Sequence, residues 1–423
     1  MVVDSASRAD RAGGSRGSRG SLGEGGTGGD EKLLALAREL LPAAVTMRRR
    51  IHAEPELGLQ LPKTKAVVLE SLAGLDLDIS HSQNTSGLVA TLEGSRPGKR
   101  LLLRGDMDAL PMPEDTGLEF ASRIPGRMHA CGHDSHTAML AAAAHLLSRR
   151  RDELAGSVSF MFQPGEEGHF GAKVMIEEGL LGDADHFDGA FAIHIAPPVP
   201  CGMLGSRGGP MLASADVFTA KLKGRGGHAS MPYDALDPIP VACEIVQALQ
   251  TFVTRRIKTF DPVVLSVTRI QSGTTNNVIP EDAEITGTLR SLSERGRSYA
   301  LEGLERIIMG IAATHEIAAE VEIQRGYPVT VNDEGFAEFV REVSRDVLGE
   351  NKWLDMPTPT MGAEDFSYVL QRTPGAMAFL GVRPEGEGRA APCHSNRMLL
   401  NEEGMVAGIA MHAGLALRFL AAD

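Results

Sequence analysis

Cysteine is scarce in this chain, with four residues among 423. So few cysteines in a chain of this length exclude the disulfide framework of a small secreted domain, and a reducing cytoplasm is the expected location. Long apolar runs are also missing, since none reaches the ~18–20 residues of a membrane-spanning helix. The first 30 residues contain no apolar stretch of the secretory type, so we expect no signal peptide.

Basic residues are outnumbered by acidic ones. Lys and Arg total 42, Asp and Glu total 55, and the formal net charge is −13. Binding to nucleic acid or to an anionic membrane requires a basic surface that can neutralise phosphates. The composition therefore argues against both kinds of partner.

The length of 423 residues exceeds what one ordinary hydrophobic core accommodates, so two domains are expected. Residues 1–30 are rich in Gly, Ser and Arg and have little to bury, which predicts a disordered tail. The residue pattern changes near residue 211 and changes back after residue 325. We therefore expect one domain from residues 31–210 and 326–423, with residues 211–325 inserted as a second domain.

The outer segments alternate short apolar strands with helices. The expected strands include GLVATLEG, RLLLRGD, SVSFMFQ, FDGAFAIHIAP and GAMAFLGV. Helical periodicity is present in the segment from residue 31, where Pro42 is expected to end or kink the helix, and in DSHTAMLAAAAHLLSRR, with Asp134 or Ser135 as N-cap. This alternation predicts an α/β domain built on a largely parallel, doubly wound sheet.

The inserted segment has a different order of elements. ADVFTAKLKG predicts a strand, DPIPVACEIVQALQTFVTRR a helix, and PVVLSVTRIQSG and AEITGTLRSL two further strands. A second helix, SYALEGLERIIMGIAATH, and a closing strand, AAEVEIQRGYP, follow. The order βαββαβ is that of a ferredoxin-like unit.

Polar side chains follow four strands of the first domain. In open α/β sheets, ligands bind outside the carboxyl ends of the strands. These strand ends would meet at one crevice, together with the loop before the helix DSHTAMLAAAAHLLSRR. The side chains gathered there would be Asp106, Asp108, Cys131, His133, Glu166, Glu167, His194 and His394.

Each of these motifs alone is weak evidence for a metal site. The cysteine could be an ordinary loop thiol, the histidine a helix-capping residue, and the two glutamates solvated surface residues. Together the motifs favour a metal site, since carboxylates gathered in one crevice need a compensating positive charge. A mixture of Cys, His and Glu favours transition metals, and the number of candidates favours two ions that share a thiolate. A thiol hydrolase that uses Cys131 and His133 is the alternative, but it leaves the strand-end residues without a role.

Eight segments occur in a characteristic order: RGDMDALP, MHACGHDSHTAML, FQPGEEGHFGAKVMIEEG, IHIAP, GRGGHASMPYDALDPI, NVIPEDAEITGTLRSL, MGAEDFS and CHSNRMLLNEEG. They resemble the di-metal aminoacylase and carboxypeptidase family of metallopeptidases, in its hippurate hydrolase and indoleacetyl-amino-acid hydrolase branch. The resemblance covers residues 36 to 420, approximately. It implies a di-metal exopeptidase-like catalytic domain with an inserted ferredoxin-like lid and dimerisation domain.

The resemblance also implies roles for the strand-end residues. Glu166 stands at the general-base position, and Asp108, accompanied by Asp106, stands at the position of the acid that orients a ligand. The implied cofactor is a pair of divalent transition-metal ions per subunit, manganese or zinc, with cobalt or nickel as alternatives. The metal-ligand positions hold Cys131, His133, Glu167, His194 and His394.

Three matches fall in the inserted segment. His228 stands where the family places a residue that reaches the other subunit's active site and helps to hold the developing oxyanion, which implies a homodimer. Asn277 and Arg290 stand at positions that hold the substrate's carboxylate, a role that suits the guanidinium fork. From the residues alone, His228 could equally be a turn residue and Arg290 a surface residue.

The implied reaction is hydrolysis of the amide bond of an N-acyl amino acid, or a related conjugate, by a metal-activated water with Glu166 as base. A dipeptidase or aminopeptidase is the alternative; a non-catalytic binding protein is disfavoured because Glu166 is present. The chain departs from the family's pattern at His169 and Phe170, which replace small residues and add bulk near the acyl pocket. We expect Cys393, beside His394, to be a packed thiol and not a ligand.

Overall fold

The computed structural model describes residues 29–182, 187–386, 388 and 390–421. The predicted tail therefore lies outside the described residues, apart from its last two positions. Asp30 caps the first helix, because its side chain accepts a hydrogen bond from the backbone N–H of Leu33 at 3.0 Å. In the described part of the chain, no helix combines the length and the apolar character that crossing a membrane requires.

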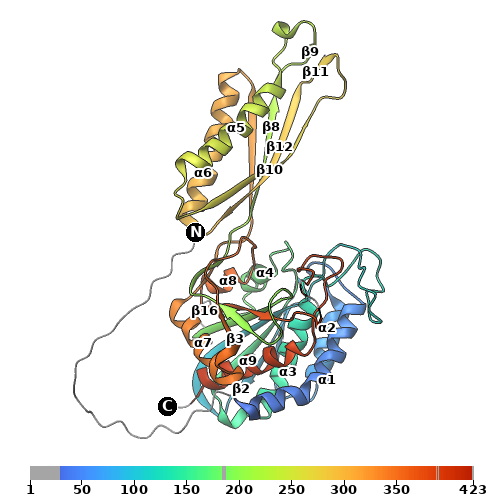
Figure 1. Ribbon diagram of the computed structural model, residues 1–423, viewed down its shortest axis with the longest axis vertical. Helices are drawn as coiled ribbons and strands as arrows, with labels where there is room; N and C mark the ends of the chain where they lie inside the picture. The colour runs from blue at the N-terminus through green and yellow to red at the C-terminus, as the bar shows by residue number, and fades with distance from the viewer. Residues whose placement is uncertain (1–28, 183–186, 387, 389, 422–423) are drawn as a thin grey trace, which may run out of the picture.

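Helices and strands alternate along the chain (Figure 1). The helices are α1 (Glu31–Ala53), α2 (Pro62–Leu72), α3 (His133–Ser148), α4 (Gly171–Glu177), α5 (Pro238–Arg256), α6 (Glu294–Thr314), α7 (Glu334–Leu348), α8 (Ser367–Leu370) and α9 (Gly404–Phe419). The strands are β1 (Asp78–His81), β2 (Leu88–Glu93), β3 (Arg96–Asp106), β4 (Ala155–Gln163), β5 (Gly189–Ala196), β6 (Leu204–Ser206), β7 (Gly209–Leu212), β8 (Asp216–Lys223), β9 (Gly227–His228), β10 (Val263–Ser272), β11 (Val278–Ile279), β12 (Asp282–Ser291), β13 (Ala318–Arg325), β14 (Thr330–Asn332), β15 (Trp353–Asp355) and β16 (Gly375–Gly381).

The larger sheet has eight strands in the order β1-β2-β4-β3-β5-β16-β6-β15. At its centre, β3 is parallel to β4 and β5, and β5 is parallel to β16. Antiparallel pairs occur at β1–β2, β2–β4 and β16–β6. The prediction of an α/β fold with a largely parallel sheet is confirmed, and the parallel centre places the carboxyl ends of its strands at one edge.

Both faces of this sheet are buried. Along β3, Leu101 and Leu103 pack into the cluster that contains α1, α3, α7 and α9, whereas Leu102 packs on the other side with α4 and α8. Figure 1 shows α1, α3 and α9 on one side of the sheet and α4 and α8 on the other. Burial on both faces explains why these strands are continuous apolar runs without polar alternation.

The structure corrects two local expectations. Pro42 does not end helix α1, which continues through it because Leu40 and Ala44 on either side are buried in the core and their packing offsets the lost backbone hydrogen bond. Helix α3 is not capped by Asp134 or Ser135. Its N-cap is Gly132, in the left-handed conformation with φ 79°, and the helix already includes His133.

A smaller unit lies in the chain between β6 and β15 of the large sheet. Its sheet has the order β10-β12-β8-β13, with all neighbours antiparallel, and α5 and α6 pack on one face around their own apolar cluster. Figure 1 shows this unit standing away from the large sheet, with the β9–β11 pair at its far end. At its near end Arg297 and Asp216 form a buried ion pair of 2.6 Å.

Candidate metal centre

The carboxyl ends of β3, β4 and β5 and the loop before α3 meet at one edge of the large sheet. The Cys131 Sγ lies 3.2 Å from the His194 Nε2, which is supplied by β5. The Glu167 Oε1, in the turn after β4, lies 3.2 Å from the His394 Nε2. His133, at the start of α3, has its Nε2 4.0 Å from the same Glu167 oxygen. Five residues from four separate segments of the sequence thus form one cluster.

Two sets of three ligand atoms can be drawn within this cluster, with the atoms of each set within 4.8 Å of one another. One set is Cys131, His133 and His194, and the other is Cys131, Glu167 and His394. The sulfur of Cys131 is common to both sets. This is the arrangement that two ions bridged by one thiolate would require.

Unsatisfied buried atoms indicate that cations fit here. His133 is fully buried, yet neither of its ring nitrogens has a hydrogen-bond partner among the described residues. An unpaired buried polar atom costs about 1–3 kcal/mol. The surrounding carboxylates outnumber the Arg104 guanidinium that lies among them; they belong to Asp106, Asp108, Glu166, Glu167, Glu364 and Asp365.

His194 is oriented as a ligand by its own backbone. Its Nδ1 lies 2.7 Å from the carbonyl oxygen of Ile195, so the Nδ1 carries the proton and the Nε2 lone pair points to Cys131. The backbone N–H of Ile195 donates to the His136 Nε2 at 2.9 Å, and the His136 Nδ1 donates to Asp106 at 2.6 Å. Burial lowers the pKa of His136 to about 4, which keeps this ring neutral.

Glu166 lies in the turn after β4 and is 6% exposed. The two oxygens of Asp108 accept the backbone N–H groups of Glu166 and Glu167 at 2.9 and 3.0 Å, and the Tyr327 hydroxyl donates to the Glu166 carbonyl oxygen at 2.5 Å. These bonds hold the main chain of the turn. Burial and the neighbouring carboxylates, first that of Glu364, raise the pKa of the Glu166 carboxyl well above its ordinary value.

Sequence reasoning missed the ionic network beneath the cluster. Arg104 is 1% exposed and donates to Gln163 at 2.8 Å, to Asp106 at 2.5 Å and to Glu364 at 2.7 Å. Asp365 joins the network through Arg104 at 3.1 Å. The available signal was an arginine inside the apolar run LLLRGD, because a charge on a strand buried on both faces needs partners.

The structure does not bring His228 and Asn277 to this cluster within one chain. His228 ends β9 and Asn277 precedes β11, and both are exposed at the tip of the smaller unit (Figure 1). The Ala229 N–H donates to the Asn277 carbonyl oxygen at 3.1 Å, so the two residues are neighbours. The Ser230 N–H donates to the His228 Nδ1 at 3.1 Å, which leaves the proton on the exposed Nε2.

Arg290 lies at the opposite end of the smaller unit, near the end of β12. Its Nη1 donates to the carbonyl oxygen of Met361 at 3.4 Å, three residues before Glu364. Arg290 is half-buried and contacts the loop that precedes α8, whereas Asn277 is exposed at the far tip of the smaller unit. Two residues predicted to hold the same carboxylate are separated within the chain.

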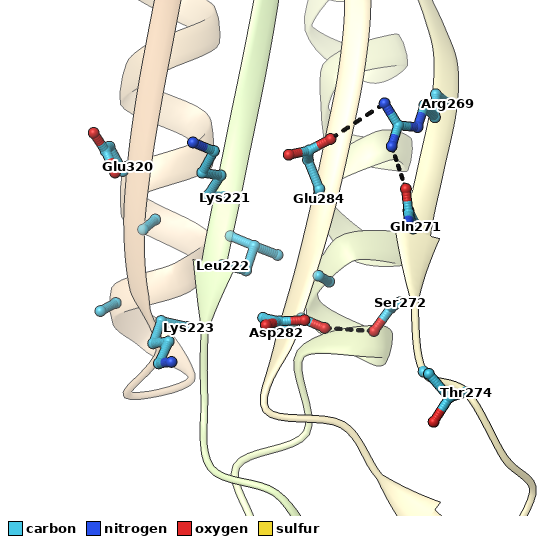
Figure 2. Close-up of a pocket in the computed structure, with 14 residues that line it drawn as sticks. Lys221, Leu222, Lys223, Arg269, Gln271, Ser272, Thr274, Asp282, Glu284 and Glu320 are labelled. Atoms are coloured by element: carbon cyan, nitrogen blue, oxygen red, sulfur yellow. Dashed lines mark hydrogen bonds and ion pairs between the residues drawn. The ribbon is translucent and has the colours of Figure 1, made fainter.

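A hollow of about 700 Å³ lies on the open face of the four-stranded sheet (Figure 2). It contains none of the predicted site residues, and acidic and basic side chains alternate across it. Arg269 pairs with Glu284 at 3.5 Å, and Lys221 stands in register between Glu284 and Glu320. These neighbouring charges offset one another, as on an ordinary solvated strand surface.

The fold and the cluster together define the class of protein: an α/β protein with Cys, His and Glu side chains that could hold metal ions at the ends of its parallel strands. The family model "Peptidase family M20/M25/M40" matches residues 102–418, and the chain belongs to this family. It is a metal-dependent amidohydrolase or metallopeptidase.

Named relatives cover nearly the whole chain. Thermostable carboxypeptidase 1 of Saccharolobus solfataricus is 40% identical over 393 residues, which are 92% of this chain and 98% of that protein. IAA-amino acid hydrolase ILR1-like 4 of Arabidopsis thaliana is 37% identical over 92% of this chain and 89% of the relative. N-acetylcysteine deacetylase of Bacillus subtilis is 36% identical over 88% and 96%.

A solved structure is similar as well. It is that of the Bacillus subtilis YXEP protein, described as a dinuclear metal-binding peptidase of the M20 family. It superposes with a TM-score of 0.77 at 33% identity, over 90% of this chain and 99% of that one.

Proposed function

We propose that this protein hydrolyses the amide bond of N-acyl amino acids or related amino-acid conjugates. The observation that carries the proposal is the position of the Cys131 sulfur in two ligand sets, with the buried Glu166 carboxyl beside them. The named relatives support the substrate class, because two of them are an IAA-amino acid hydrolase and an N-acetylcysteine deacetylase.

The proposed cofactor is a pair of divalent transition-metal ions, manganese or zinc, with cobalt or nickel as alternatives. Each set of ligand atoms described above would hold one ion. When bound, the ions supply Lewis acidity that polarises the scissile carbonyl and activates water near neutral pH. One of the two unpaired nitrogens of His133 would then have a metal partner.

Glu166 acts as the general base in this proposal. Its carboxylate takes a proton from the attacking water and passes it to the leaving nitrogen, so that the amide is split into a carboxylate and a free amino acid. Asp108 contributes by fixing the turn, since it accepts the N–H groups of both glutamates. Arg104 supports the opposite side by binding Asp106 and Glu364.

The smaller unit, residues 211–325, is proposed as a lid and dimerisation domain. Within one chain, His228 and Asn277 lie at its far tip and Arg290 at its base. In a homodimer the tip of one subunit would enter the site of the other. There the His228 Nε2–H would stabilise the oxyanion, and Asn277 would join the Arg290 of the second chain in holding the substrate's carboxylate. This requires the lid to move.

A peptidase activity is the second candidate, favoured by the 40% identity to a carboxypeptidase. Both reactions cleave an amide next to a free carboxylate, so Arg290 would serve either. They differ in what stands on the acyl side, where a dipeptidase must also accommodate a charged amine.

The four cysteines are free thiols, which supports the proposed location in a reducing cytoplasm.

The test is a hydrolysis screen of the full chain after chelation and addition of one defined metal at a time. We expect N-acyl amino acids to be cleaved and the matching free dipeptides to be poor substrates, with two ions bound per chain. Preferred cleavage of free dipeptides would favour the peptidase. Absence of hydrolysis for every substrate in metal-loaded protein would contradict both candidates.

A further inference from the structure

Cys393 adds a second thiol to the candidate metal centre. The thiols of Cys393 and Cys131 interact with each other, and the sulfur of Cys393 lies 3.9 Å from the carbonyl oxygen of Ile195. Cys131 contacts the preceding residue, His194, so both sulfurs face the end of β5. Among the described residues, Cys393 belongs to neither ligand set. Cys393 thus interacts with the thiol of Cys131 and is not itself one of the candidate metal ligands.

The backbone already holds the two cysteines next to each other. The His394 N–H donates to the Ala130 carbonyl oxygen at 2.8 Å. This bond joins the peptide group that follows Cys393 to the one that precedes Cys131. Both cysteines therefore lie directly beside one short main-chain contact, which favours the approach of their side chains. A disulfide between them requires Cα atoms about 4.4–6.8 Å apart.

We propose that Cys131 and Cys393 are a peroxide-sensitive thiol pair that closes to an intrachain disulfide. Cys393 is half-buried and Cys131 is 6% exposed, so a peroxide meets Cys393 first. The Cys393 thiolate attacks the O–O bond, which gives a sulfenic acid and hydroxide. The Cys131 thiol then displaces the sulfenic oxygen, which leaves as water. In sum, two thiols lose two hydrogens and one peroxide is reduced to two waters.

This closure would act on both ligand sets at once, because the Cys131 sulfur belongs to each of them. A sulfur in a disulfide is no longer a thiolate ligand. The loss of metal rests on the proposed function, whereas formation of the disulfide does not. Bound ions would compete with the Cys393 sulfenic acid for the Cys131 sulfur, so closure is expected to be faster in chelated protein.

The experiment treats metal-loaded and chelated full-length protein with hydrogen peroxide and then digests it with trypsin without reduction. Each cysteine falls in its own tryptic peptide, residues 128–149 and residues 390–397. We expect these peptides to appear cross-linked, two hydrogens lighter than their sum, and to separate with dithiothreitol. A chromophoric chelator reports the metal released over the same time course.

Two variants sharpen the test. Cys393→Ser should bind metal as the parent does and release it at least 10-fold more slowly in peroxide. Cys243→Ser, which alters an exposed thiol on α5, should behave like the parent. Absence of the cross-link from chelated parent protein would overturn the proposal, as would equal release from Cys393→Ser. A cross-link in a protein that binds no metal would contradict the proposed function and leave the thiol pair standing.

Discussion

The cluster at the strand ends and the β9–β11 tip differ in how completely one chain assembles them. In the cluster, His133 is fully buried and Cys131 and Glu166 are each 6% exposed, and hydrogen bonds hold the surrounding main chain. At the tip, His228 and Asn277 are exposed on a two-stranded pair. The chain thus completes one half of the proposed site in its own core and presents the other half on its surface.

This difference between the cluster and the tip follows from the contrast between buried and solvent-exposed ionisable side chains. Buried carboxylates and imidazoles must find partners during folding, so their geometry is set within the chain. An exposed imidazole is solvated and needs no partner until it meets one. Variants of the core half should therefore act within each chain, whereas variants of the tip should depend on a second chain.

The largest effect is expected in the core half, from Glu166→Gln. The amide cannot accept the proton of the attacking water, so kcat should fall by ~10²- to 10⁴-fold. Metal content should stay near that of the parent, because Glu166 is in neither of the two sets that share Cys131. Steady-state kinetics with elemental analysis measure both quantities.

The matched control is Glu177→Gln on α4, which removes an exposed carboxylate. It should leave kcat unchanged. Turnover of Glu166→Gln within a few-fold of the parent would assign the base to another group.

The tip half is tested by His228→Ala, which should lower kcat by ~10²-fold or more through loss of an oxyanion donor. Mixing these chains with Glu166→Gln chains should restore activity in heterodimers, because one site then contains both residues intact. Activity after subunit exchange measures this. Verified heterodimers without recovery would show that His228 does not act in the other subunit's site.

A smaller effect is expected from Arg290→Ala. Loss of a charge-assisted bond should lower kcat/KM about 10- to 100-fold for substrates with a free carboxylate. The corresponding primary amides should be affected much less. Arg269→Ala, on the same sheet and paired with Glu284, is the control that should change neither. Equal losses for acid and amide would remove carboxylate recognition from the role of Arg290.

The smallest effect is expected from His136→Asn, which alters the support of a ligand and no ligand itself. The asparagine can still donate toward Asp106 but leaves the Ile195 N–H without its acceptor, so His194 loses alignment. Metal affinity should weaken about 10-fold, measured by isothermal titration with a competing chelator. His145→Asn, later on α3, should bind metal like the parent. Equal weakening in both variants would indicate a general loss of helix packing.

Much of the fold could be predicted, because the central strands are apolar runs buried on both faces. Helix α7, which has a strongly amphipathic pattern, was not identified, and Pro42 was given too much weight. The Arg104 network was missed because its members come from three separate segments. Apart from Arg104, whose position inside an apolar strand was a signal, each member alone resembles an ordinary turn or surface residue, and their shared burial distinguishes them.

The sequence by itself determined which side chains were available: a thiol, imidazoles and carboxylates at the ends of apolar strands, with matching family segments around them. It predicted that these side chains would gather in one crevice, but it could not determine which of their atoms contact one another. Only the tertiary structure decided that the Cys131 sulfur belongs to two ligand sets, that Cys393 lies against it, and that Arg290 and Asn277 are apart within one chain. The physical reason is that distances between residues far apart in sequence depend on strand order and on packing across the sheet, which local patterns do not encode.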